Sequence, residues 1–112
     1  MAIKSVALEL DKVYNLRFGM GAEIKYEQLT GEKVSEIDLE NFSMVQLANL
    51  LWVMIIDGDS QSKNLLLVDV ARLVDEYASD IASVYAKLNE AVGAAWTVDE
   101  KTKNSGKSKN QL

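Results

Sequence analysis

A helix predicted over residues 44–56 is apolar on nearly its whole circumference, and this feature most constrains how the chain can fold. Its second half, residues 50–56, is an uninterrupted apolar run, and Ser43 is a suitable N-cap. A helix without a polar face must be buried on all sides, either at the centre of a bundle or against another protein. The chain has 112 residues, enough for one domain with one core, so the sequence leaves both arrangements open.

Alternating apolar residues predict a β-hairpin over 5–18, with its turn at Asp11-Lys12. The pattern of residues 20–30 fits both a strand and a helix, and that alternative stays open. We interpret the segment as a helix because its composition favours one and because Thr30-Gly31 is a suitable C-terminal stop. Residues 32–42 are expected to form a polar connector with one short turn and four inward-facing apolar anchors, Val34, Ile37, Leu39 and Phe42.

Two further helices are predicted after a polar loop. One spans 64–77 and the next spans 80–95, for which Ser79 can serve as the cap. Residues 98–112 are rich in Lys, Asn, Ser and Gly, a composition typical of a disordered tail. The predicted fold class is therefore α+β, mostly α. It consists of an N-terminal β-hairpin followed by a bundle of about four helices, in a single globular domain over residues 1–97.

The residue types that are missing from the sequence exclude several classes of function. The chain has no His and no Cys, so a Ser-His-Asp triad, a disulfide and a Cys/His zinc site are all impossible. The net charge is −5, and residues 1–97 carry 8 basic and 15 acidic side chains, which argues against nucleic-acid binding. The longest apolar run is far below the roughly 20 residues of a membrane span. We therefore expect a cytoplasmic protein that binds no nucleic acid, no membrane and no cofactor.

Two motifs begin like ligand-binding loops, and we interpret both as structural. Gly19-Met20-Gly21 resembles the first half of a dinucleotide fingerprint, but Ile24 stands where a third glycine is needed. Asp57-Gly58-Asp59 begins like a calcium loop, but Ser62 and Val68 stand where Gly and Glu are required. No pair of carboxylates has neighbours that suggest a catalytic pocket. The sequence therefore predicts neither a catalytic site nor a metal site.

The apolar surplus of two predicted helices indicates a protein-binding function. Trp52 lies inside the run of helix 44–56, and the four consecutive apolar residues Leu65-Leu66-Leu67-Val68 cannot all face one core. These apolar residues belong either to the core of the bundle or to a partner surface, and both interpretations stay open. For a partner surface, we expect the contact on helices 44–56 and 64–77, and the same surfaces would permit a homo-oligomer. The contact candidates are Leu51, Trp52, Ile55 and Leu67.

Three stretches of the sequence resemble the tail assembly chaperones of long-tailed bacteriophages and related prophages. They are residues 14–22 (Tyr-Asn-Leu-Arg-Phe-Gly-Met-Gly-Ala), 26–33 (Tyr-Glu-Gln-Leu-Thr-Gly-Glu-Lys) and 70–77 (Val-Ala-Arg-Leu-Val-Asp-Glu-Tyr). In that family a strand leads into a helix that ends in a corner of the Leu-Thr-Gly-Lys type, and a Leu-Ile-Asp-Glu-Tyr helix precedes the last amphipathic helix.

The resemblance implies a function that is not enzymatic. Such proteins bind the long, apolar tape measure protein in the cytoplasm of the bacterial host, keep it soluble and help recruit tail tube subunits. They are absent from the mature virion. The alternative is a small structural tail component or adaptor that stays in the particle.

Overall fold

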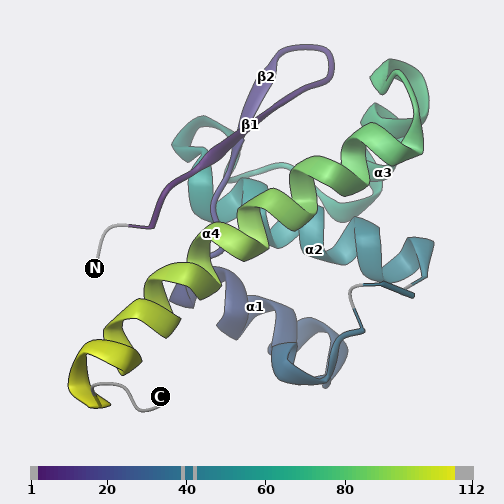
Figure 1. Cartoon of the computed structure of the whole chain (residues 1–112). Helices are drawn as coiled ribbons and strands as arrows, with labels where there is room; N and C mark the ends of the chain where they lie inside the picture. Colours follow the sequence, from purple (N-terminus) through teal and green to yellow (C-terminus); the bar gives the residue numbers. More distant parts are fainter. Residues whose placement is uncertain (1–2, 39, 42, 108–112) are drawn as a thin grey trace.

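In the residues that the structure describes, 3–38, 40–41 and 43–107, a two-stranded antiparallel hairpin precedes four α-helices (Figure 1). Side chains are described as far as residue 95. This computed structural model confirms the predicted α+β, mostly α class. The elements are β1 (Val6–Glu9), β2 (Val13–Leu16), α1 (Met20–Thr30), α2 (Met44–Gly58), α3 (Leu67–Tyr77) and α4 (Ile81–Lys107), with short 3-10 turns η1 (Val34–Glu36) and η2 (Ser60–Ser62).

The hairpin presents one apolar face to the helices. Its register pairs Val6 with Leu16 and Leu8 with Tyr14, and these four side chains are all buried. The connection between the strands contains Asp11 and Lys12, as predicted. Helix α2 packs against β2 and helix α4 packs against β1. A two-stranded sheet is marginal by itself, so the two helices supply most of its stability.

Helix α2 lies at the centre of the fold, which explains its uniform apolar character. It contacts β2, α1, α3 and α4 (Figure 1). Ser43 caps the helix as predicted, because its Oγ accepts a hydrogen bond from the Gln46 amide at 3.2 Å. The sequence left open whether this helix is buried at the centre of the bundle or against another protein. The structure shows it buried inside the chain's own bundle. Its fully enclosed side chains are Leu50, Leu51, Val53, Met54 and Ile55.

Helix α1 confirms the helical interpretation of residues 20–30 and ends at the predicted corner. Gly31 adopts φ 74°, a left-handed conformation that glycine accepts without steric cost, and its N–H donates to the Glu27 carbonyl at 2.8 Å. The Thr30 hydroxyl donates to the Tyr26 carbonyl and accepts from the Glu32 N–H. These bonds end the helix sharply and direct the chain toward η1.

The connector between α1 and α2 is anchored as predicted where it is described. Val34 and Ile37 are both buried in the core, and η1 is the expected short turn. The other two predicted anchors, Leu39 and Phe42, lie outside the described residues.

The two C-terminal helices begin later than predicted. Helix α3 starts at Leu67 rather than at residue 64, because the Asp69 carboxylate accepts a hydrogen bond from the Leu66 N–H and holds residue 66 in an extended conformation. Helix α4 starts at Ile81, and its cap is Asp80 rather than Ser79. The Asp80 carboxylate accepts from the Ser83 N–H at 2.7 Å, and this bond lowers the pKa of Asp80.

Helix α4 is also longer than predicted. Val84, Leu88 and Val92 are buried at its packed face, whereas Ile81 at its start is exposed. The helix continues to Lys107 rather than ending near 95. No proline interrupts the segment, and no glycine follows Gly93 until Gly106, so the sequence contains no early stop. Residues 108–112 lie outside the described part.

Candidate interaction surface

Two of the four predicted contact residues are core residues. Leu51 and Ile55 are each 0% exposed. Their enclosure excludes them from contact with a partner in this conformation, so the prediction is wrong for both. The reason is that α1, β2, α3 and α4 surround α2, which a helical pattern alone does not reveal. Trp52 and Leu67 are half-buried and keep part of their surface exposed.

Trp52 connects three parts of the fold. Its indole N–H donates to the Leu65 carbonyl at 2.8 Å, which fixes the segment that leads into α3. The Lys25 Nζ of α1 lies 5.0 Å from the centre of the indole ring, a cation–π distance. Trp52 is therefore largely occupied within the chain itself.

An open apolar groove lies between the first half of α2 and the middle of α3. Its volume is about 140 Å³. Met44 at its edge is 56% exposed, and Ala48 and Ala71 contribute side chains too small to fill it. Six of its seven lining residues are apolar: Met44, Leu47, Ala48, Val70, Ala71 and Val74, with Asp75 as the seventh.

The apolar pattern of the sequence indicated the two helices of this groove but not the residues that line it. Leu67 lies on the same side of α3 as Val70, Ala71 and Val74 by helical spacing, but neither it nor any other predicted contact residue lines the groove. The signal that could have located the groove is the pair of alanines, Ala48 and Ala71, at positions where the same helix faces otherwise carry large side chains.

Further large apolar side chains are exposed away from the groove. Val45 follows Met44 on α2 and is 68% exposed, and Leu66 and Val68 at the start of α3 are also exposed, so the run 65–68 indeed faces more than one environment. The others are distributed over the hairpin, α1 and the junction of α3 with α4: Val13, Met20, Ile24, Leu29, Tyr77 and Ile81.

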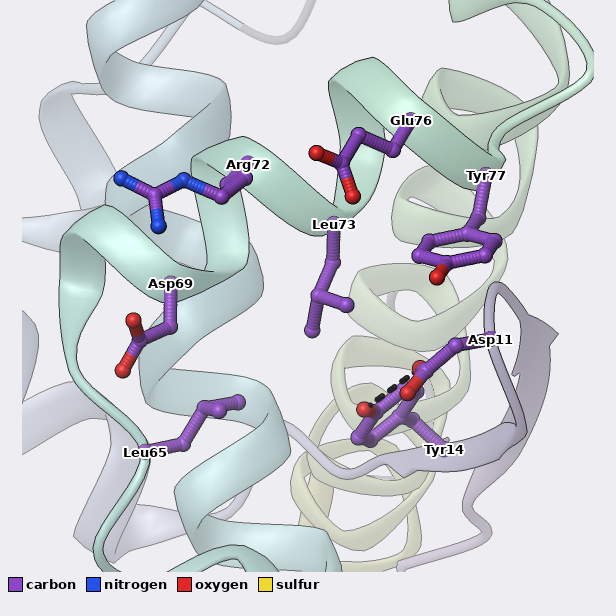
Figure 2. Close-up of a pocket in the computed structure, with 8 residues that line it drawn as sticks. All are labelled: Asp11, Tyr14, Leu65, Asp69, Arg72, Leu73, Glu76 and Tyr77. Carbon is purple, nitrogen blue, oxygen red and sulfur yellow. Dashed lines mark hydrogen bonds between the residues drawn. The ribbon is translucent and has the colours of Figure 1, made fainter.

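The opposite side of α3 faces a polar cleft at the tip of the hairpin (Figure 2). Asp11 and Tyr14 come from the hairpin, and the Tyr14 hydroxyl donates to the Asp11 carboxylate at 2.7 Å. The Lys12 Nζ lies 5.1 Å from the centre of the Tyr14 ring. Helix α3 contributes Asp69, Arg72, Leu73, Glu76 and Tyr77. Burial, together with the hydrogen bond to Asp11, raises the pKa of Tyr14 to about 12.

We expect this tyrosine to make the fold sensitive to alkali. The folded state holds the phenolic proton more tightly than the unfolded state, whose tyrosine pKa is near 10.0. The associated stability is complete below that pH and is lost as the pH rises toward 12. Unfolding in urea, measured at pH values between about 9 and 11, should therefore show a declining free energy of unfolding, and the Tyr14→Phe variant should show a shallower decline. Equal slopes for the two proteins would contradict this expectation.

The Gly19-Met20-Gly21 and Asp57-Gly58-Asp59 motifs meet each other in the structure. The Asp57 carboxylate accepts hydrogen bonds from the Arg17 guanidinium at 2.8 Å and from the Gly19 N–H at 3.0 Å, so it caps the start of α1. A Cβ on Gly21 would lie 2.9 Å from this carboxylate, so a side chain at this position would require the carboxylate to move. Asp59 caps η2 by accepting from the Gln61 N–H. Both carboxylates are therefore used to connect elements.

The described part of the chain offers neither a metal site nor a membrane-spanning segment. Among residues 3–38, 40–41 and 43–107, no cluster of three or more acidic side chains is placed to hold a metal ion. Within the same ranges, no helix combines the length and the apolar character needed to cross a bilayer. Comparison of the chain with models of known protein families, with curated proteins and with solved structures gives no match.

Proposed function

We propose that this protein is a bacteriophage tail assembly chaperone, which binds the tape measure protein in the host cytoplasm and keeps it soluble until the tail tube encloses it. On this proposal it also helps to recruit tail tube subunits, has no enzymatic activity and is left out of the mature virion. The observation that carries the proposal is the open apolar groove between α2 and α3, bordered by the exposed side chain of Met44.

The chemistry of the groove suits an aggregation-prone helical client. A tape measure chain exposes apolar helical faces before assembly, and such faces associate with one another unless they are covered. A groove between two antiparallel helices accepts the apolar face of a third helix. Residues 1–97 carry a net charge of −7, which keeps a complex soluble and makes neighbouring complexes repel each other.

The local structure of the resembling stretches also supports the proposal. The family pattern places a strand before a helix that ends in a Thr-Gly corner. Here β2 leads into α1, and α1 ends at Thr30 with Gly31 in the left-handed conformation. The third stretch, residues 70–77, contributes Val70, Ala71, Val74 and Asp75 to the groove.

We expect the Ala71→Glu substitution to weaken client binding roughly tenfold, because it would place an unpaired carboxylate against an apolar client. The assay co-expresses the chain with a tape measure protein and measures the soluble fraction of that client after centrifugation. Wild-type chain should raise the fraction and the variant should not. Ala71 is exposed, so the variant should fold, and circular dichroism with thermal unfolding verifies this.

The matched control is Ala86→Glu on α4. Ala86 is likewise an exposed helical alanine, and an acidic residue stands four positions later in both cases, Asp75 after Ala71 and Glu90 after Ala86. The control should keep the client as soluble as wild-type chain does. A client that stays insoluble with wild-type chain would contradict the proposal. So would mass spectrometry that finds the chain in purified virions at a stoichiometry of structural proteins.

A further inference from the structure

The geometry points to Asp75 as the residue that selects the groove's occupant: an amphipathic helix of a partner protein with a lysine or arginine beside its apolar stripe. This inference rests on the proposed function, since it concerns the same groove, and it goes further by naming the chemistry that the groove recognises.

The size of the groove defines the apolar part of the occupant. Its volume of about 140 Å³ is close to the roughly 150 Å³ of an apolar protein cavity that takes up a benzene ring. One large aliphatic or aromatic side chain therefore fills it. Met44, at 56% exposure, can then fold over this anchor from the edge. A helical occupant presents such an anchor together with neighbours at positions three and four residues away.

The charge of the groove defines the polar part of the occupant. Asp75 is its one charged lining residue. Arg72, the one cation of α3, lines the cleft on the opposite side of that helix (Figure 2). Among the described residues, no side chain or backbone group forms a hydrogen bond or an ion pair with the Asp75 carboxylate. An apolar occupant without a cation would desolvate this carboxylate at a cost, whereas a lysine or arginine one turn from the anchor would pair with it.

A second copy of this chain is a poorer occupant than a basic helix. Met20 and Ile24, the two most exposed of the large apolar residues of α1, lie on one side of that helix and have Glu23 and Glu27 as neighbours. Docking α1 of another copy into the groove would therefore bring carboxylates toward Asp75. Like charges at an interface disfavour such a pairing, so the charge pattern selects against self-association and for a basic partner.

A pair of synthetic peptides tests this inference with the full chain. Both are about 20 residues long, enough for a helix of about 30 Å, and share one leucine stripe at helical spacing. In one peptide the flanking positions are lysine, and in the other they are glutamate. Fluorescence anisotropy of the labelled peptides measures their dissociation constants. Wild-type chain should bind the lysine peptide about fivefold more tightly than the glutamate peptide, which is the gain in affinity expected from one partly exposed ion pair. The Asp75→Asn variant should lose the preference, and Asp75→Lys should reverse it.

The matched control is Glu76→Lys, which makes the same change in net charge one residue further along α3, in the opposite cleft. It should keep the preference for the lysine peptide. Equal effects of Glu76→Lys and Asp75→Lys would overturn the inference, since they would assign the preference to overall charge. Absence of peptide binding, or a dimer of the wild-type chain that Ala71→Glu dissociates in light scattering, would overturn it as well.

The two proposals fail separately. A client that wild-type chain keeps soluble, with no charge preference traceable to Asp75, would leave the chaperone function standing and remove this inference. If Asp75→Lys reverses the peptide preference but the chain has no effect on the client's solubility, this inference would stand and the chaperone function would be removed.

Discussion

Truncation of Leu51 to alanine is expected to lower the free energy of unfolding by about 3 kcal/mol. Leu51 is fully enclosed at the centre of α2, and removing a buried leucine side chain loses its transfer free energy and leaves a cavity that the neighbours fill only in part. A domain of this size has a total stability on the order of 5–15 kcal/mol, so the loss is a large fraction. Urea denaturation followed by tryptophan fluorescence measures it, because Trp52 is the next residue.

Leu66→Ala is the matched control for this truncation. It removes the same atoms from a side chain that is 59% exposed, just before α3. The change in unfolding free energy should stay within about 0.5 kcal/mol. The comparison also decides between the two roles considered for Leu51. A residue that served only as a partner contact would leave the unfolding free energy unchanged when truncated, so an unaltered midpoint for Leu51→Ala would contradict its assignment to the core.

Local signals made much of the fold predictable from the sequence. The Ser43 cap, the corner at Thr30-Gly31 and the alternation of the hairpin each depend on residues within four or five positions of one another. Such features are short-range, so a single sequence contains all the information that they require. The start of α3 was not predicted, although the interaction that determines it is also short-range. The Asp69 carboxylate accepts a hydrogen bond from the Leu66 N–H, so the helix begins after Leu66. The spacing of apolar residues gives no indication of this hydrogen bond.

The candidate surface was less predictable because burial is a tertiary property. Helical spacing shows which residues of α2 share a face, but a helix that is apolar all round has no face to distinguish. Leu51 and Met44 look equivalent in the sequence, yet the elements packed around α2 enclose Leu51 and leave Met44 exposed. The groove depends further on two small side chains, Ala48 and Ala71, that stand opposite each other only once the helices are packed. A single sequence shows their size but not their juxtaposition.

Replacement of Gly58 by alanine is expected to lower the free energy of unfolding by about 3 kcal/mol, although alanine is the better helix former. Gly58 is the last residue of α2 and lies against the hairpin. A Cβ there would overlap the Asn15 carbonyl oxygen and come within 2.9 Å of the Arg17 backbone nitrogen. Both are backbone atoms of the β2 region, so the strand must move as a unit. The same movement would break the hydrogen bond from the Arg17 N–H to the Met54 carbonyl.

Gly93→Ala on α4 is the same chemical change, but it is expected to have the opposite effect on the free energy of unfolding. A Cβ at Gly93 has nothing within 4 Å, and the residue lies inside a helix, so alanine should raise the free energy of unfolding by about 0.5–1 kcal/mol. Helix propensity predicts a gain at both positions, and only the contact with β2 reverses the sign at Gly58. Urea denaturation of the two variants therefore tests the packing of α2 on the hairpin. A Gly58→Ala protein as stable as Gly93→Ala would show that this contact is not present in solution.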